Sequence, residues 1–213
     1  MGKIVAIVNQ KGGVGKTTTA VNLTAGLGIN GKKVLLVDID PQGNTTSGFG
    51  IDKRQVLVSS YDLIMGNRPS NEIIVKTKFK GVDVIQSSMN LAGAEIELTA
   101  IENRETRLKN ALAAVREQYD YILLDCPPSL GLITLNALTA TDTFLVPIQC
   151  EYFALEGLSQ LMSTMRQVKR LYNPTLELEG VLLTMYDGRL NLTQQVVSVI
   201  KKLFKKKLYN SVI

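Results

Sequence analysis

The residues of this chain that could do chemistry are concentrated between positions 11 and 18, where the sequence reads KGGVGKTT. An apolar run, residues 4–8, precedes this segment, and a helical pattern, residues 20–27, follows it. Glycines let backbone N–H groups approach phosphate oxygens without a Cβ clash, lysine supplies a positive charge, and a threonine hydroxyl can bind Mg²⁺. Strand, glycine-rich loop and helix in this order predict a phosphate-binding loop. The predicted loop residues are Lys11, Gly12, Gly13, Val14, Gly15, Lys16, Thr17 and Thr18.

The loop departs from the usual pattern G-x-x-x-x-G-K-[ST] at its first position, where Gln10 stands in place of glycine. A second lysine, Lys11, lies five residues before Lys16. We predict that Lys16 binds the β- and γ-phosphates, that Thr17 binds Mg²⁺, and that both lysines neutralise charge while a phosphoryl group is transferred to water. The alternative is that Lys11 is a solvated loop lysine and that the glycines only form a turn.

Carboxylates follow two apolar runs that we predict to be strands. Asp38 and Asp40 lead from the run 33–38 into a loop rich in proline and glycine, and Asp125 closes the run 120–125. Carboxylates beside a phosphate loop can hold Mg²⁺ through water or orient an attacking water molecule. We assign Asp40 to water positioning and to the metal, Asp125 to Mg²⁺, and Asp38 to the outer coordination sphere. The alternative for Asp38 and Asp40 is that they only cap the loop.

The composition excludes several other kinds of chemistry. The chain has no histidine, which excludes imidazole catalysis and histidine metal ligands. Its two cysteines, Cys126 and Cys150, lie at the ends of apolar runs and are predicted to be buried thiols instead of a disulfide. No apolar run approaches the roughly 18 residues that a membrane span needs. With 45% hydrophobic and 20% charged residues, we expect an ordinary cytoplasmic protein.

The net charge of +5 is unevenly distributed. Residues 1–187 carry 18 basic and 19 acidic side chains, whereas residues 188–213 carry six basic side chains and no acid. Residues 192–207 predict an amphipathic helix with lysines mostly opposite its apolar positions. The alternatives are a solvated helix face, a membrane surface, or DNA phosphates as an anionic partner. We favour DNA, and the predicted DNA-binding residues are Arg189, Lys201, Lys202, Lys205 and Lys206.

Apolar runs alternate with helical patterns along the whole chain, which predicts parallel strands joined by crossover helices. The predicted strands are 3–9, 33–38, 82–86, 120–125, 143–148, 179–184 and 209–213. The predicted helices are 16–29, 60–65, 104–117, 130–140, 154–171 and 192–207. Because no linker or repeat interrupts this pattern, we predict a single α/β domain, residues 1–213, with a doubly wound, mostly parallel sheet flanked by helices. Ligands of such sheets bind at the carboxyl ends of the strands.

Five stretches of the chain carry a family resemblance. They read VNQKGGVGKTTT from Val8, LLVDIDPQGN from Leu35, DCPPSLG from Asp125, QCEYFALEG from Gln149 and GVLLTMYDGR from Gly180. In this order they closely resemble the ParA/Soj chromosome and plasmid partitioning proteins, a branch of the deviant Walker A (MinD/ParA) P-loop ATPases. The resemblance covers essentially the whole chain.

The resemblance implies an ATPase that acts as a switch with ATP and Mg²⁺. ATP closes a homodimer in which Lys11 contacts the nucleotide of the partner, and Gly12 leaves room for that approach. The closed dimer binds double-stranded DNA without sequence preference, through residues such as Arg189 and the lysines after it. A ParB-type DNA-binding protein then stimulates hydrolysis and releases the dimer from the nucleoid. A membrane is not among the implied partners.

The chain departs from the family pattern near its C-terminus. Relatives continue with a Pro-Arg-Asn segment that contacts adenine and with a final helix, whereas this sequence stops at Ile213. We therefore expect a P-loop ATPase domain without the last C-terminal segment of the family. The alternatives are a MinD-like membrane-associated ATPase, a nitrogenase iron-protein relative, an ATP-dependent small-molecule ligase, and a truncated non-catalytic form that binds nucleotide or DNA.

Overall fold

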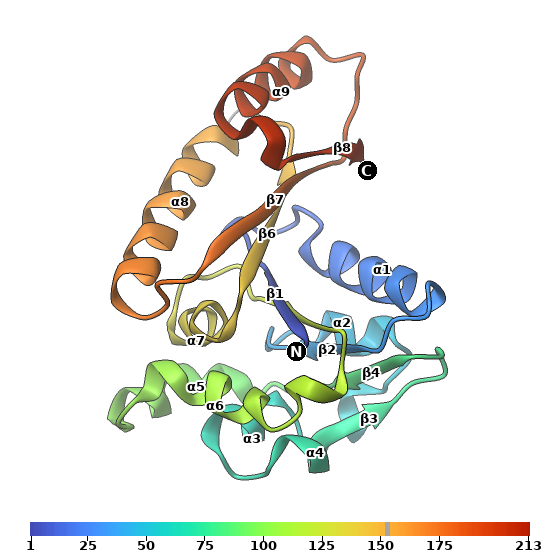
Figure 1. Cartoon of the computed structure of the whole chain (residues 1–213), viewed down its shortest axis with the longest axis vertical. Coiled ribbons are helices and arrows are strands. Elements are labelled where there is room, and N and C mark those ends of the chain that lie inside the picture. The colour runs from blue at the N-terminus through green and yellow to red at the C-terminus, as the bar shows by residue number, and fades with distance from the viewer. Residues whose placement is uncertain (152–153) are drawn as a thin grey trace.

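The described part of the chain is built around one sheet. The computed structural model describes residues 1–151 and 154–213, so Tyr152 and Phe153 of the fourth family-like stretch lie outside the described residues. The sheet has eight strands in the order β3-β4-β2-β5-β1-β6-β7-β8 (Figure 1). Neighbouring strands are parallel except for β3 and β4. The strands are β1 (Lys3–Ile7), β2 (Val34–Asp38), β3 (Ile74–Lys76), β4 (Val82–Ile85), β5 (Tyr121–Asp125), β6 (Thr143–Gln149), β7 (Glu177–Thr184) and β8 (Leu208–Val212).

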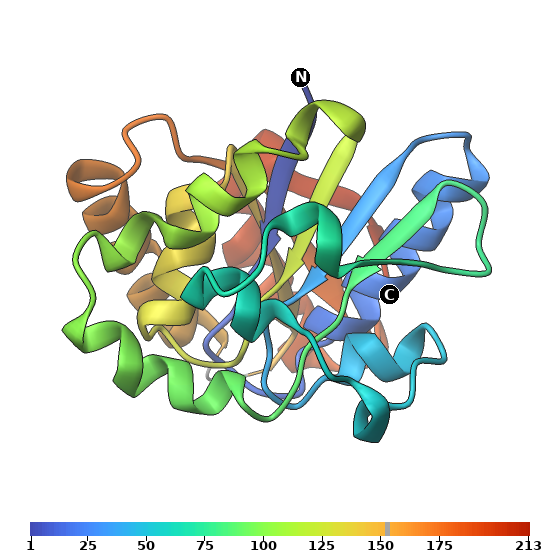
Figure 2. The same cartoon turned by 90° about the horizontal axis from the view of Figure 1, so that it is seen from below.

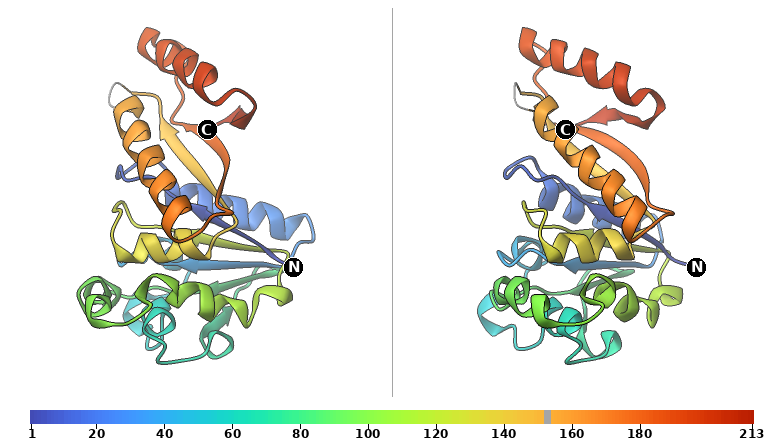
Figure 3. Two further views of the ribbon diagram at one scale, coloured as in Figure 1. Left: turned by 60° about the vertical axis from the view of Figure 1, so that its left-hand side comes forward. Right: turned by 90° about the vertical axis from the view of Figure 1, so that its left-hand side faces the viewer.

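Helices cover both faces of the sheet, because the buried strands are apolar on both sides (Figures 2 and 3). Along β1, Val5 and Ile7 face the layer of α1, whereas Ile4 and Ala6 belong to the larger core under the other helices. That larger core includes buried residues of α3 and of α5 through α9. The α-helices are α1 (Lys16–Ile29), α2 (Asn44–Gly48), α3 (Ser60–Met65), α4 (Ser70–Ile73), α5 (Leu91–Glu97), α6 (Arg107–Ala113), α7 (Leu132–Ala140), α8 (Ala154–Leu171) and α9 (Asn191–Phe204).

The predicted fold class is confirmed, and each predicted strand is present with small differences at its ends. Strand β3 and helices α2, α4 and α5 were not predicted. β3 has only three residues and α4 only four, which is too short for a periodic signal. The helix predicted over 104–117 was too long, since only Arg107–Ala113 is α-helical and 3₁₀ turns flank it. No helix among the described residues is long and apolar enough to cross a membrane.

Strand pairing brings the polar residues at the ends of the strands together. In the parallel register Ile7 lies opposite Asp125, and Asp125 lies opposite Asp38 on its other side. The loop after β1 and the loop after β2 therefore start next to the end of β5. This edge of the sheet, with the carboxyl ends of three adjacent strands, positions the candidate site.

Candidate active site

The loop between β1 and α1 has the backbone conformation that a phosphate-binding loop requires. Gly13 and Gly15 have φ values of +72° and +86°, a left-handed region that glycine adopts without steric cost. The Lys16 ammonium folds back over the loop and donates to the carbonyl of Lys11 at 2.9 Å. On the other side the Thr184 hydroxyl donates to the carbonyl of Val14 at 2.8 Å, which ties the loop to the end of β7. The loop is thus closed around the start of α1.

Asp125 is the carboxylate nearest to the first turn of α1. Its Oδ2 accepts hydrogen bonds from the hydroxyls of Thr17, at 2.8 Å, and Thr45, at 2.7 Å. Its Oδ1 is buried and has no hydrogen-bond partner among the described residues. Burial raises the pKa of Asp125 to about 6, although the two hydroxyls oppose this change. A buried, unpartnered carboxylate oxygen is costly, so this oxygen marks a place for a ligand.

Asp38 and Asp40 have different surroundings although they are two residues apart. Asp38 is completely buried, and its oxygens accept hydrogen bonds from the Thr46 amide and hydroxyl and from the Asp40 amide. Burial raises the pKa of Asp38 to about 7, with the charge of Asp125 adding to the effect. Among the described residues, the Asp40 side chain accepts one hydrogen bond, from the Gln42 amide, and its second oxygen has no partner there. Asp38 therefore organises the loop after β2, while Asp40 presents a carboxylate.

The residues at this edge fit ATP and Mg²⁺. Burial lowers the pKa of Lys16, and the nearby carboxylates of Asp125 and Asp40 oppose that change. An ammonium held in such a place suits a phosphate group, which restores the interactions that burial removes. Thr17 and Asp125 offer the hydroxyl and carboxylate oxygens that magnesium prefers. The described residues contain no group of three His, Cys, Asp or Glu that could cage a metal, and Mg²⁺ commonly keeps water and phosphate as its other ligands.

Lys11 forms an ion pair with Glu151, two residues after the end of β6. Its backbone amide donates to Asn9 Oδ1 at 3.0 Å, so the start of the loop is fixed while the side chain remains partly exposed. A Cβ placed on the neighbouring Gly12 would meet nothing within 4 Å in the described chain. The tip of the loop is therefore open on the outer side of the molecule. The partner of Lys11 was not predicted, because nothing in the sequence relates Glu151 to the loop.

The segment after Asp125 is held by a residue that sequence reasoning missed. The Glu95 carboxylate of α5 accepts hydrogen bonds from the amides of Leu132, at 2.8 Å, and Ile133, at 3.2 Å, in the first turn of α7. A carboxylate at this position also suits the positive end of the helix dipole. Glu95 therefore connects α5 to the segment that follows β5.

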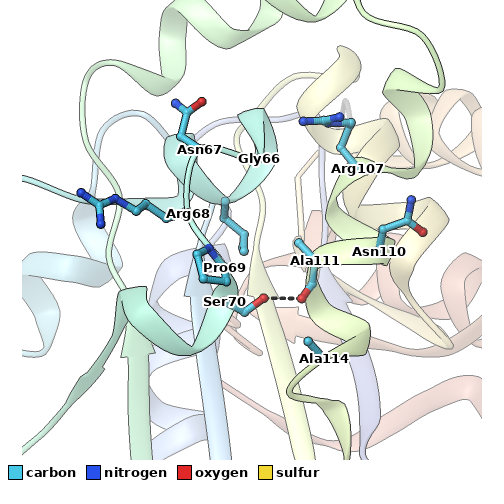
Figure 4. Close-up of a pocket in the computed structure, with 10 residues that line it drawn as sticks. Gly66, Asn67, Arg68, Pro69, Ser70, Arg107, Asn110, Ala111 and Ala114 are labelled. Carbon is cyan, nitrogen blue, oxygen red and sulfur yellow. Dashed lines mark hydrogen bonds between the residues drawn. The ribbon is translucent and has the colours of Figure 1, made fainter.

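The two largest hollows described on the surface lie away from the loop. One, of about 570 Å³, lies between the turn that joins α3 to α4 and helix α6, where Ser70 hydrogen-bonds to the carbonyl of Ala111 (Figure 4). The other, of about 590 Å³, lies beside the β3–β4 hairpin. Neither is lined by residues 11–18, so neither adjoins the place where a nucleotide would react.

The predicted DNA-binding residues do not form one cluster. Arg189 lies before the start of α9, and its guanidinium pairs with Asp187 at 2.6 Å while 88% of its side chain stays exposed. Lys201 and Lys202 lie in the last turn of α9, and Lys205 and Lys206 lie in the 3₁₀ turn that follows. Helix α9 separates the two groups by roughly 20 Å. The five cations thus lie at the two ends of one helix.

The apolar face of α9 is only partly buried. Val196 and Ile200 pack in the core, whereas 38% of Val199 and 65% of Leu203 are exposed. Strand β8 follows α9 close to the predicted range, and it pairs with β7 as the edge strand of the sheet. Cys126 and Cys150 are free buried thiols, which confirms the prediction that they form no disulfide.

Comparison with known proteins identifies the class of protein to which the chain belongs. Residues 2–178 match the AAA domain family, in agreement with the loop and the sheet described above. Over its full length the chain is 58% identical to the sporulation initiation inhibitor protein Soj of Bacillus subtilis and 49% identical to the chromosome partitioning protein ParA of Myxococcus xanthus. It covers 84% and 75% of those proteins, respectively.

Among solved structures, cobyrinic acid a,c-diamide synthase from Mycobacterium smegmatis with bound ADP and magnesium superimposes with a TM-score of 0.91 at 40% sequence identity. The superposition covers 96% of this chain and 83% of that one. The fold, the loop between β1 and α1 and the full-length alignments with Soj and ParA together identify a P-loop ATPase. The chain belongs to the ParA/Soj family of chromosome partitioning ATPases.

Proposed function

We propose that this protein hydrolyses ATP at the loop between β1 and α1 and uses the nucleotide state to control dimerisation and DNA binding. The observation that carries the proposal is the unpartnered Oδ1 of Asp125, buried beside the Thr17 hydroxyl and the charged end of Lys16. A carboxylate from the end of β5 therefore lies close to a hydroxyl and an ammonium group from the start of α1. ADP and magnesium bind in the structurally similar Mycobacterium smegmatis protein, which supports the same pair of ligands here.

Each residue of the site has a separate role in this proposal. Lys16 leaves the Lys11 carbonyl and holds the β- and γ-phosphate oxygens, while the loop amides from Gly12 to Thr18 hold the remaining oxygens. Thr17 and Asp125 hold the metal, and Asp40 orients the attacking water with its free carboxylate oxygen. Magnesium, when bound, neutralises the phosphate charge that develops during the reaction. A role for Asp38 in the outer coordination sphere remains part of the proposal.

A dimer completes the site by adding a second lysine. Lys11 is held by Glu151 in the single chain, and its side chain is 40% exposed at the open tip of the loop. On dimerisation across this face, Lys11 leaves Glu151 and contacts the nucleotide of the other copy. Gly12 supports this arrangement, because the chain itself leaves empty space where its side chain would be. An arriving surface can therefore approach the backbone closely.

The DNA-binding surface is formed by Arg189 and the lysines at the end of α9. No acidic residue occurs from position 188 onwards, and among the described residues Asp187 is the carboxylate that pairs with Arg189. Lysine and arginine contacts to phosphates give affinity without sequence preference. A ParB-type protein bound at marked DNA sites then stimulates hydrolysis, and the cytoplasmic protein cycles on and off the nucleoid. The names of the Soj and ParA relatives support chromosome segregation as the purpose of this cycle.

The test is binding to non-specific duplex DNA with ATP, with ADP and without nucleotide, across a series of salt concentrations. We expect tight binding with ATP that weakens linearly on a plot of log affinity against log salt. ATP turnover measured on the same preparation separates the switch from a non-catalytic scaffold. Equal affinity in all three nucleotide states, together with normal turnover, would refute the switch.

A further inference from the structure

A second basic surface lies at the opposite edge of the sheet from α9. The strand order places β3 at one edge and β8 at the other, and the β3–β4 hairpin and α9 occupy opposite ends of the molecule (Figure 1). The hairpin has the sequence KTKFK over residues 76–80, and it packs against the turn before β2, where the Val34 amide donates to the Gly81 carbonyl at 2.8 Å. We call this surface the hairpin face, formed by Lys32, Lys33, Lys76, Lys78 and Lys80, all exposed.

The positive charge of the hairpin face is largely uncompensated. The one carboxylate in its hollow, Asp83, is 8% exposed and already bonds to Lys76 Nζ at 2.7 Å and to the Tyr119 hydroxyl at 2.8 Å. Asp120, at the rim, accepts a hydrogen bond from the Lys33 backbone amide. The ion pairs found among the described residues leave Lys32, Lys33, Lys78 and Lys80 unpaired.

The shape of the surface concentrates this charge. Lys33, Lys76 and Lys80 line one hollow of about 590 Å³, which also includes the polar groups of Thr77 and Gln118. Phe79, between two of the lysines, is 51% exposed, and its ring packs edge-on against Phe49 with 5.7 Å between the centroids. That contact holds the hairpin against the body of the protein. A fixed group of lysines loses less freedom on binding than a mobile tail.

We propose that the hairpin face is a second contact for the phosphate backbone of duplex DNA, and that this contact does not depend on nucleotide. The face has several exposed lysines and one carboxylate that is already paired, so it is complementary to a polyanion of high charge density. Lysines bind phosphates as point charges and do not read the base sequence. The hairpin turn precedes β4 and Lys32 precedes β2, so the face lies at the amino ends of these parallel strands, whereas the loop that ATP would occupy follows the carboxyl end of β1. A bound nucleotide therefore leaves the face uncovered. One molecule could then contact DNA at both edges of its sheet. The inference rests on the proposed function for the identity of the polyanion.

The test compares two double variants of the full chain that remove the same charge. Lys78→Gln with Lys80→Gln changes the hairpin face, and Lys109→Gln with Lys169→Gln changes exposed lysines on α6 and α8. Binding of a fluorescein-labelled duplex is measured by anisotropy without nucleotide across a salt series. We expect the hairpin variant to bind severalfold more weakly and its log–log salt slope to flatten by about 1.8, since each lost phosphate contact removes about 0.9. The control variant should retain the slope of the original protein.

The outcomes separate this inference from the proposed switch. The ratio of DNA affinity with ATP to that without nucleotide reports the switch, and the hairpin variant should preserve it. Equal losses in both double variants would reduce the effect to net charge and overturn the inference, as would no DNA binding by the original protein without nucleotide. If the hairpin variant kept its DNA affinity and lost affinity for labelled polyglutamate, the face would serve acidic polypeptides, which also overturns the inference.

Discussion

The loop edge of the sheet and the two lysine-rich surfaces hold their charges in opposite ways. At the loop edge, Lys16, Asp38 and Asp125 are buried, and their polar atoms have fixed partners apart from Asp125 Oδ1. At the end of α9 and on the hairpin face, the lysines are exposed and mostly unpaired. Removing one buried group leaves its partners unsatisfied, whereas removing one exposed lysine takes away one screened interaction. Single residues should therefore dominate catalysis, whereas DNA affinity should be a sum of small terms.

The largest expected effect is the loss of ATP binding in Lys16→Ala. The change removes the only buried ammonium of the described loop and the charge that the phosphates require. We expect affinity for ATP, measured by calorimetry, to fall by roughly 100-fold or more. Lys109→Ala, an exposed lysine of α6, serves as the control and should bind ATP normally. Normal ATP affinity in Lys16→Ala would show that the loop does not hold the nucleotide.

Asp40→Ala should separate binding from turnover at the same edge. Its free carboxylate oxygen orients water in the proposed mechanism, whereas the phosphates are held by the loop. ATP turnover should fall by about 100-fold, in the range for a lost general base or water-positioning group, while ATP-dependent dimerisation persists. Asp52→Ala removes an exposed carboxylate of the following loop and should leave turnover unchanged. Unaltered hydrolysis in Asp40→Ala would assign the water to another residue.

The buried carboxylates also predict how stability depends on pH without nucleotide and metal. The folded protein keeps a proton on Asp38 up to about pH 7, whereas the unfolded chain releases it near pH 4. Between these values the folded state binds more protons, so the free energy of unfolding falls as the pH rises. The free energy of unfolding, measured by urea denaturation, should fall between pH 5 and pH 8. This fall should be smaller by about 2 kcal/mol in Asp38→Asn than in the original protein.

Asp52→Asn is the matched control for the pH experiment, because Asp52 is exposed on the surface and burial does not raise its pKa. Its loss of stability between the two pH values should equal that of the original protein. If Asp38→Asn also showed the same loss, the proton of Asp38 would not be the source of the pH dependence. The comparison uses the change with pH, so a uniform change in stability of either variant does not affect it.

The smallest effect is expected at the exposed surfaces. Arg189→Ala should lower DNA affinity in the ATP state by a few fold and flatten the log–log salt slope by about 0.9, while turnover stays unchanged. Arg54→Ala is a close control, because Arg54 pairs with Asp52 two residues before it, as Arg189 pairs with Asp187. A loss of turnover in Arg189→Ala would indicate a structural role for this arginine.

Much of the fold could be predicted because its signals are local. The helices over 16–29, 60–65 and 154–171 were predicted with the bounds that the structure shows, and parallel pairing was predicted from the alternation of apolar runs with helices. The order of the strands within the sheet was not predicted. Short elements such as β3 were missed because three residues at a sheet edge carry no periodic pattern. The residue types of the loop were also sufficient to predict phosphate binding, because backbone conformation, charge and hydroxyl chemistry are set by residues next to one another.

Several residues that complete the site come from distant parts of the chain and are brought together only by folding. Glu151 pairs with Lys11 across 140 positions, and Thr45 donates to Asp125 across 80 positions. The hairpin face was hidden in the sequence, because the lysines of residues 32–80 are balanced by acids elsewhere in the chain. The class of chemistry and the order of the elements along the chain follow from the sequence alone, since both depend on neighbouring residues. Which charges remain paired, buried or free depends on contacts between distant segments, and only folding establishes those contacts.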